Sequence, residues 1–508
     1  MNEPDSFPVI IVTGVMTTGV HVFVFRRDLR VEDNTGLSEL CDRLRGARHG
    51  HLLLPVFVLD DRQVDPRANP YYSARAARFM ADCLQDLGRR TGGALRVFRG
   101  GDRAALDAVR ASTPIESVSF NADCTPFARE RDAALAGWCA ERGIDCHACT
   151  REYHLLDPRA MAKPYQVFTP YFRRCTREVG VPKPTGLPAQ LEALLKVKLK
   201  AKVKAKVKVP TLTPAAIRRV LCGSGSVRHE PVAGGRDRAL ELLGRVRSGA
   251  FGGYEQSRDR LASPGTTGLS AHLKFGCLSV REFYHAVLSK HGDKEHGLIR
   301  QLYWRNFYEQ VAWHFPHVLA GQGDANANAN VSLRPKYDAV LWNTSSVHFR
   351  AWQEGRTGFP IVDAGMREMR ETGRMHNRLR MVTASFLVKD LLVDWRAGER
   401  HFAASLVDYD PCSNSGGWQW VAGGGADPQQ YTRVFSPWLQ ARRFDPTGEY
   451  VRRWVPELRS VPTSDLLAWD RATVRAAHLD TGYPEPVVDH ASSARSAVAA
   501  YRLALKPA

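Results

Sequence analysis

A short stretch near the middle of the chain, residues 254–276, carries hydroxyl side chains in a pattern typical of phosphate binding. A Pro-Gly pair at 264–265 ends a loop, and Thr266, Thr267 and Ser270 follow at the expected start of a helix. Free backbone N–H groups at a helix N-terminus and capping hydroxyls together hold phosphate oxygens. Because most capping Ser and Thr residues bind no ligand, the pattern needs a second signal before it indicates a site.

A second group of polar residues stands in an otherwise apolar part of the sequence, between 376 and 425. It comprises Arg380, Asp408, Asp410 and Asn414. A buried charge needs a partner of opposite charge or a polar ligand, because an isolated charge inside a protein is costly. We therefore expect these side chains to surround a polar group that is not part of the chain.

Tryptophans are concentrated in the same half of the sequence, where ten of the eleven lie at or beyond Trp304. Their large faces can pack in a core or stack against other rings. For any single tryptophan, core packing is the usual explanation. The concentration indicates that functional stacking, where it occurs, belongs to the C-terminal half.

The elements that would position these residues differ between the two halves. From 21 to 149, helical stretches alternate with short apolar runs, namely HVFVF, HLLLPVFVLD, ALRVFRG and SVSFNAD. Such repetition predicts a doubly wound parallel sheet with helices on both faces. Ligands of these sheets bind at the carboxyl ends of the strands, which here are the loops 25–34 and 120–126. Neither loop carries the G-x-G-x-x-G dinucleotide fingerprint.

Changes of composition divide the chain into five expected segments. These are a leader over 1–19, an α/β domain over 20–180, a linker over 181–235, an all-helical domain over 236–467 and a C-terminal tail over 468–508. The linker contains seven lysines within 196–208, a run that favours a solvated tether over a contact with a DNA backbone. A low-complexity insertion occupies 324–330, and helical periodicity continues from 380 to 395.

Composition narrows the class of partner and compartment. The 508 residues carry a formal net charge of +18, which favours a polyanion such as nucleic acid. Ten cysteines without paired spacing indicate a reducing compartment. Cys146, Cys149 and His154 lack the second ligand pair of a zinc site, so we expect no metal. The apolar stretch 8–25 follows acidic residues instead of a basic region, which indicates a leader and a buried strand rather than a membrane span.

Longer segments of the sequence resemble one known family. The stretches 351–368, 376–425 and 431–458 resemble the flavin-binding core of DNA photolyases and cryptochromes. The stretch 254–270 is similar to the family's phosphate-holding segment, and 25–34 to its first strand and loop. The resemblance implies an antenna-type α/β domain followed by an all-α FAD-binding domain, and it is closest to class I cyclobutane pyrimidine dimer photolyases.

The resemblance also implies which residues hold FAD. Its phosphates and ribityl chain would contact Tyr254, Thr266, Thr267, Gly268, Leu269 and Ser270. Further cofactor-binding positions are Arg305, Arg380, Asp408, Tyr409, Asp410 and Asn414. In the family, Arg380 and Asp408 correspond to an ion pair beside the isoalloxazine ring. Asn414 corresponds to the group facing flavin N5, where an amide can donate or accept as the flavin changes protonation.

Catalytic and substrate-binding residues follow from the same resemblance. The catalytic set is Trp342, Trp395, Trp418, Asn414 and Gln301, of which the three tryptophans match an electron relay from the flavin to the surface. The expected DNA and lesion contacts are Arg258, Gln301, Trp304, Asn377, Arg378, Met381, Trp420, Arg433 and Gln440. In the implied reaction, light excites reduced FAD, an electron passes to a flipped cyclobutane dimer, the ring splits, and the electron returns.

A few positions bear on the type of lesion. Asn377 and Met381 stand where (6-4) photolyases carry two histidines, which favours the cyclobutane class. Gln301 stands where that class usually has a glutamate, and His376 is expected outside the pocket. The alternatives are a (6-4) photolyase and a cryptochrome-type signalling photoreceptor. Only about 43 residues follow Asp465, which favours the enzyme because cryptochromes often carry a long extension.

The remaining expectations concern a second chromophore and the partners. The loops 25–30 and 120–132 are similar to the antenna-contacting segments of the family. Whether methenyltetrahydrofolate, 8-hydroxy-5-deazaflavin or no antenna binds there stays open. The expected partner is DNA, duplex or single-stranded, that contains a pyrimidine dimer. We expect an intracellular monomer that does not contact a membrane.

Overall fold

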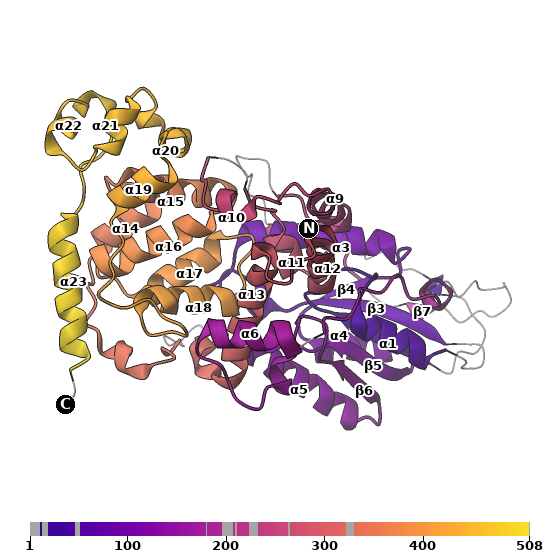
Figure 1. The fold of residues 1–508 in the computed structure, drawn as a ribbon. Coiled ribbons are helices and arrows are strands. Elements are labelled where there is room, and N and C mark those ends of the chain that lie inside the picture. The colour runs from indigo at the N-terminus through magenta and orange to yellow at the C-terminus, as the bar shows by residue number, and fades with distance from the viewer. Residues whose placement is uncertain are drawn as a thin grey trace, which may run out of the picture.

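The computed structural model describes residues 11–12, 19–45, 51–178, 180–195, 207–208, 211–222, 232–262, 265–321 and 330–506. Figure 1 shows an α/β domain, coloured indigo to magenta, beside a helical domain that is largely orange and yellow. Apart from 11–12, 19, 207–208 and 330, the predicted leader, lysine run and low-complexity insertion lie outside the described residues. No helix in the described part of the chain is long and apolar enough to cross a membrane.

A five-stranded parallel sheet forms the α/β domain, in the order β4-β3-β2-β5-β6. The strands are β2 (Val20–Phe25), β3 (Leu52–Leu59), β4 (Arg96–Arg99), β5 (Ile115–Asn121) and β6 (Asp145–Cys149). Strand order reverses at β2, so the loops after β2 and β5 meet at the switch point where ligands of such sheets bind. A separate antiparallel pair consists of β1 (Ile11–Val12) and β7 (Val207–Lys208).

Alternate residues of β2 enter two different cores, as expected for a sheet covered on both faces. Val20, Val22 and Val24 pack with α4 (Asp102–Arg110) and α5 (Pro126–Ala140). Phe23 and Phe25 join the core that contains α1 (Thr35–Arg43) and α3 (Ala74–Arg90). Shorter helices complete this half: α2 (Asp61–Val64), η1 (Pro158–Ala160), α6 (Phe168–Glu178), α7 (Leu191–Leu195) and α8 (Pro214–Cys222).

The second half is helical, so the predicted fold class is confirmed. Its first elements are α9 (Arg236–Arg247), α10 (Tyr254–Ser257), α11 (Ser270–Lys274), α12 (Val280–His291), α13 (Gly297–His314), η2 (Pro316–Leu319), η3 (Pro335–Ala339), α14 (Ser346–Glu354) and α15 (Pro360–Thr372). Then follow α16 (Asn377–Ser385), the π-helical η4 (Phe386–Asp390), α17 (Trp395–Ser405), α18 (Pro411–Ala422), α19 (Pro437–Phe444), α20 (Glu449–Trp454), η5 (Pro456–Leu458), α21 (Thr463–Leu467), α22 (Ala472–Ala476), η6 (Leu479–Thr481) and α23 (His490–Ala504).

The continuous helical periodicity over 380–395 does not produce one helix. After α16 the chain makes the π-helical turn η4, and α17 begins only at Trp395. Leu392 adopts φ of 52°, a left-handed conformation in which a helix cannot continue. Asp394 then caps α17 by accepting the Arg396 N–H at 3.0 Å. Local backbone chemistry therefore overrides the apolar pattern.

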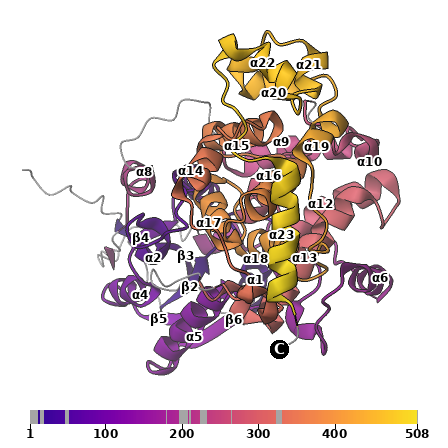
Figure 2. The same cartoon turned by 90° about the vertical axis from the view of Figure 1, so that its left-hand side faces the viewer.

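The segment 468–508, expected as a tail, contains α22, η6 and α23. In Figure 2, α23 runs along the helical domain. Its Tyr501 is fully buried and lies against Trp342, with ring centroids 6.1 Å apart, and His490 bonds to Asp390 of η4. The folded part of the helical domain thus extends past the predicted boundary at 467. The predicted domain boundaries otherwise stay predictions.

Buried ion pairs join the two domains. Arg281 of α12 contacts Asp33 at 3.2 Å and Glu152 at 3.0 Å, and Glu152 also pairs with Arg30. All four side chains are almost inaccessible to solvent. Removing one partner would leave a buried charge uncompensated, at a cost of about 3–5 kcal/mol. The network therefore fixes the sheet relative to the helices that carry the site.

Candidate functional site

A cavity of about 600 Å³ lies in the helical domain. Residues from the α10–α11 segment, α13, α16, the loop 406–410 and α18 line it. Most of the sequence-predicted site residues are brought together on its walls: Tyr254, Arg258, Thr266, Thr267, Gly268, Leu269, Ser270, Gln301, Trp304, Arg305, Asn377, Arg380, Met381, Asp408, Tyr409, Asp410, Asn414, Trp418 and Trp420.

Five predicted residues do not line this cavity. Trp395 is buried at the start of α17, and Trp342 is partly buried against Tyr501. Arg378 pairs with Asp259 at 2.8 Å, and Arg433 lies over the ring of Phe435. Gln440 belongs to α19. Trp395 and Trp342 thus lie outside the lining of this cavity.

The hydroxyl-rich stretch adopts the conformation that the sequence predicts. Ser270 is the first residue of α11, and Thr267 Oγ1 accepts the Leu269 N–H at 3.3 Å. Gly268 has φ of 70°, a left-handed conformation that glycine adopts without strain, and an added Cβ there would meet no atom within 4 Å. The partly buried Lys274 adds a cation four residues after Ser270. Hydroxyls and a cation therefore face the same cavity.

Arg380 and Asp408 form an ion pair on the cavity wall, in which one guanidinium nitrogen contacts both carboxylate oxygens. Arg380 Nη2 donates to both Asp408 carboxylate oxygens at 3.0 and 2.9 Å, and its Nε donates to the Met375 carbonyl at 2.9 Å. These bonds occupy the Nε and Nη2 donors of the guanidinium and hold its plane in one orientation. The side chain is 29% exposed, so a polar ligand can still reach it.

Asp410 caps helix α18 and also carries a negative charge. Its Oδ1 accepts the Ser413 N–H at 3.0 Å at the start of α18. Burial alone would raise the pKa of this carboxyl, but Arg27, Arg305 and Lys274 outweigh that effect and lower it. Asp410 is therefore ionised and adds a negative charge beside the Arg380–Asp408 pair.

Asn414 is held by Glu399, which the sequence analysis did not identify. Asn414 Nδ2 donates to the Glu399 carbonyl at 3.1 Å and to its Oε1 at 2.9 Å. Burial raises the pKa of Glu399 to about 7 against the opposing Asn414 bond. The one available signal was spacing, because Trp395, Glu399 and Phe402 follow each other on one face of α17.

One face of α13 supplies another wall. Gln301, Trp304, Arg305 and Tyr308 recur at helical spacing and all line the cavity. Trp304 stacks on Phe168 from the α/β half, with centroids 3.7 Å apart and planes 4° apart. Since Phe168 covers one indole face, the other is the one available to a ligand.

His376 corrects one expectation, because it lines the cavity instead of lying outside it. As the cap of α16, its Nδ1 accepts the Arg378 N–H at 3.1 Å. Burial lowers its pKa, although the Arg258 backbone opposes this change. The imidazole is therefore neutral near pH 7.

Trp418 is the one of the three relay positions that reaches the cavity. It is buried and packs against Phe402, with centroids 4.9 Å apart, and against Trp352, 6.2 Å away. Trp352 is fully buried and donates its Nε1–H to the Thr383 carbonyl at 3.0 Å. The sequence analysis did not identify Trp352 because buried tryptophans are ordinary core residues.

A second cavity, of about 280 Å³, lies at the carboxyl ends of the strands. The two loops expected to bind a ligand contribute Arg26, Arg27, Asp123 and Thr125 to its lining. Arg27 spans the domains, since it pairs with Asp123 at 2.7 Å and with Asp410 at 3.4 Å. Lys274, Tyr409 and Asp410 line both cavities, so the two cavities are neighbours.

The larger cavity suits a flavin dinucleotide. Its volume of about 600 Å³ falls within the range of roughly 300–1,000 Å³ found for small-molecule sites. Hydroxyls and Lys274 match the phosphates, while the Arg380–Asp408 pair and the Asn414–Glu399 contact offer polar partners to a ring system. Two domains joined by buried charges around such a cavity define a flavin-binding α/β-plus-helical protein.

Comparisons with known proteins agree. Residues 21–189 match the DNA photolyase family, and residues 298–503 match the FAD binding domain of DNA photolyase. The chain belongs to the DNA photolyase family. The deoxyribodipyrimidine photo-lyases of Alkalihalophilus pseudofirmus and Escherichia coli are 33% and 34% identical to it, over 94% and 97% of this chain and 97% and 100% of theirs. An archaeal photolyase structure from Sulfolobus tokodaii with two FAD molecules is 33% identical at a TM-score of 0.78, covering 95% of this chain and 100% of that one.

Proposed function

We propose that this protein repairs cyclobutane pyrimidine dimers in DNA by light-driven electron transfer from FAD. The observation that carries the proposal is that one cavity joins two different sets of residues. Phosphate-matching hydroxyls and the Arg380–Asp408 pair suit a cofactor, whereas Trp304 and Met381 suit flipped bases. A shared cavity puts the two molecules in contact, as electron transfer requires.

The cofactor set divides its work. Thr266, Thr267 and Ser270 would bind phosphate oxygens, with Lys274 balancing their charge. Arg380 would stabilise negative charge on the flavin ring, and Asp408 would hold the guanidinium in place. Asn414, fixed by Glu399, would present its amide to the ring nitrogen.

Bound FAD, once reduced and excited by light, supplies the electron that splits the dimer. The chain itself contributes binding, orientation and exclusion of water. Trp304, backed by Phe168, offers one rigid indole face for a thymine, and Trp420 adds a second aromatic surface. Gln301, on the same face of α13 as Trp304, can hydrogen-bond a thymine carbonyl.

The lining favours a cyclobutane dimer over a (6-4) product. Repair of the latter needs a proton donor, which is usually a histidine with a pKa near neutrality. His376 reaches the cavity, but burial keeps it neutral. Asn377 and Met381 cannot act as general acids.

Trp418, Trp395 and Trp342 would return the flavin to its reduced state by passing electrons inward. Trp418 lines the cavity, Trp395 is buried outside its lining, and Trp342 is partly exposed. The partial exposure of Trp342 supports a relay that ends at the surface. Trp352, next to Trp418, is a further aromatic neighbour on that route.

Damaged DNA is the proposed partner, and Arg258, Arg378, Arg433 and Gln440 are its proposed contacts around the cavity-lining residues. The smaller cavity is the proposed place for an antenna chromophore. We infer a monomer inside the cell, where DNA is held, and the nine cysteines that the structure describes are all free, as a reducing compartment would keep them.

The test is illumination of the reduced, FAD-loaded protein with oligonucleotides that contain one cyclobutane dimer or one (6-4) product. Dimer repair in light and not in the dark is the expected result. Trp304→Ala should weaken binding of the damaged strand by about 1–3 kcal/mol, as loss of one stacked base does. Trp313→Ala, on the same helix but outside the cavity lining, is the matched control.

The outcomes separate the alternatives. Repair of the (6-4) product without dimer repair would favour the (6-4) class and overturn the lesion assignment. Repair of neither lesion by protein that retains FAD would favour the photoreceptor. Equal loss of binding in both tryptophan variants would remove Trp304 from the binding surface.

A further inference from the structure

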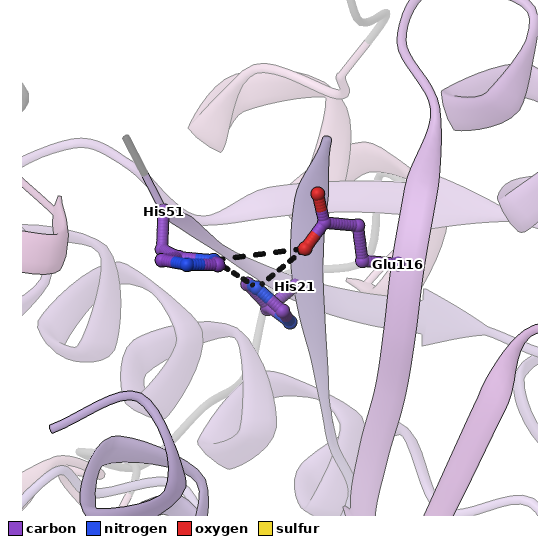
Figure 3. A group of neighbouring side chains, drawn as sticks. All are labelled: His21, His51 and Glu116. Atoms are coloured by element: carbon purple, nitrogen blue, oxygen red, sulfur yellow. Dashed lines mark hydrogen bonds and ion pairs between the residues drawn. The ribbon is translucent and has the colours of Figure 1, made fainter. Parts of the chain in front are cut away.

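Three side chains converge at the amino end of the sheet, away from the carboxyl-end cavity. His21 belongs to β2, Glu116 to β5, and His51 immediately precedes β3 (Figure 3). His21 Nε2 lies 2.7 Å from His51 Nδ1 and 3.1 Å from Glu116 Oε2, and the last two atoms are 3.6 Å apart. Among the described residues, no other group of three His, Cys, Asp or Glu ligand atoms is this compact, within 4.8 Å of one another.

The sheet is built so that Glu116 reaches this point. Val20 pairs with Ile115 but His21 pairs with Ser117, so the register between β2 and β5 skips Glu116. Such a bulge re-aims the side chain of the extra residue. Gly19 leaves room for it, because an added Cβ would lie 2.7 Å from Glu116 Cγ.

His21 is oriented as metal-binding histidines are. Its Nδ1 and the Ser117 hydroxyl are 2.8 Å apart, an outer bond that fixes the ring and directs Nε2 toward the other two ligands. The side chain is buried. The neutral imidazole is the form that carries a lone pair for a metal.

We propose that His21, His51 and Glu116 form a binding site for a divalent transition-metal ion of the zinc class. With metal–ligand distances of about 2.0–2.1 Å, the corners of a tetrahedron lie about 3.3 Å apart. The three observed separations of 2.7, 3.1 and 3.6 Å bracket that value. The fourth corner is open to a water molecule or another small ligand.

The ligand types select the ion. Two imidazoles and one carboxylate suit Zn²⁺ and its neighbours, whereas Mg²⁺ and Ca²⁺ prefer sites made of oxygen alone. One carboxylate leaves the occupied site with a net charge of about +1 before any ligand takes the open corner. The ion would tie the starts of three adjacent strands, so its role is to stabilise the α/β domain. The proposal does not depend on the repair reaction.

The experiment uses untagged, FAD-loaded protein that has been treated with a chelator and titrated with ZnCl₂ in a calorimeter. One equivalent of Zn²⁺ should bind the unaltered chain and raise its unfolding temperature. His51→Ala and Glu116→Gln should weaken binding at least about 100-fold, beyond the roughly tenfold to 100-fold loss expected for Ser117→Ala in the outer shell. His147→Ala, on the neighbouring strand β6, is the matched control and should bind normally.

Cobalt supplies a second measurement. Co²⁺ at this site should give visible absorption of a four-coordinate ion, and His51→Ala should abolish it while flavin content stays unchanged. The proposal is overturned when the unaltered chain binds no more Zn²⁺ than His51→Ala, or when His147→Ala loses as much affinity. Because His51 is partly exposed, its replacement tests the ligand without opening the core.

Discussion

The two cavities of this protein share lining residues, but most of the side chains that line them are of different kinds. The larger one is lined by Trp304, Trp418 and Trp420, whereas no described residue that lines the smaller one is a tryptophan. The arginines of the smaller cavity are already matched, since Arg26 makes two bonds to Asp102 at 2.9 and 2.6 Å. Among the described lining residues, tryptophans thus face only the larger cavity.

From this difference we propose that the larger cavity serves the chemistry and the smaller one an antenna chromophore. A molecule in the sheet cavity would lie next to the larger cavity, but no tryptophan would line its own site among the described residues. Helix α17 stands between the two, because its Phe402 lines one cavity and its Ala403 the other. Changes on the flavin side should impair cofactor binding or photoreduction, whereas changes on the sheet side should only lower repair under weak light.

The largest effect is expected from Asp408→Ala. It leaves Arg380 without its carboxylate partner, and loss of a charge-assisted bond costs about 1.5–3 kcal/mol. FAD affinity should therefore fall about tenfold to 100-fold, as measured by the flavin-to-protein absorbance ratio after dialysis. Asp470→Ala breaks another Arg–Asp pair, with Arg442, and serves as the control. Full flavin retention in the Asp408 variant would count against the assigned cofactor site.

Trp418→Phe is expected to have the second largest effect. Phenylalanine keeps most of the packing against Phe402 but is much harder to oxidise, so photoreduction of oxidised FAD should almost cease. Repair by chemically reduced protein should stay nearly intact, since the relay is not needed for it. Trp469→Phe, another buried tryptophan of the helical domain outside the cavity lining, is the control. Unchanged photoreduction in Trp418→Phe would show that Trp418 has a packing role only.

The sheet and the cavity lining also differ in how far the sequence alone predicts them. Strands β2 to β5 followed from short apolar runs, because a strand buried on both faces is recognisable locally. Strand β6, with the sequence Asp-Cys-His-Ala-Cys, lies at the sheet edge, is only partly buried and gave no such run. The cavity lining was predicted through motif resemblance, since its residues come from segments far apart in the chain.

Pairs made by packing escaped the sequence analysis. Phe168 and Trp304 belong to different halves and meet only after the domains dock. Glu399 sits in an ordinary helical sequence, and its burial beside Asn414 depends on how α17 packs on α18. The break at η4 depends on the left-handed Leu392, which the apolar periodicity conceals.

Glu399→Gln should have a moderate, pH-dependent effect. The folded-state pKa is about 7 against an ordinary 4.5, so between these values the folded protein binds more protons and stability falls as pH rises. Glutamine carries no ionisable proton, so the variant avoids this decline in the free energy of unfolding, which amounts to at most about 3 kcal/mol above pH 7. Thermal unfolding of FAD-loaded protein should show a stabilised variant at pH 8.5 and little difference at pH 4.5. Glu449→Gln, at the surface, should show no such dependence, and a pH-independent effect of Glu399→Gln would argue against the raised pKa.

The smallest effect on repair is expected from filling the sheet cavity. Ala128 of α5 is buried and lines it, so Ala128→Leu should take space from a second chromophore without touching the flavin side. Under saturating light, repair should equal that of the unaltered protein, because the flavin absorbs directly. Under weak light at wavelengths absorbed by the antenna, the rate should fall to that of flavin alone, and the second absorption band should disappear from the purified protein. Ala133→Leu, exposed on the same helix, is the control. Persistence of the second absorption band in Ala128→Leu would place the antenna elsewhere. Loss of FAD from Ala128→Leu would instead show that a change in the smaller cavity reaches the larger one through the shared residues Lys274, Tyr409 and Asp410.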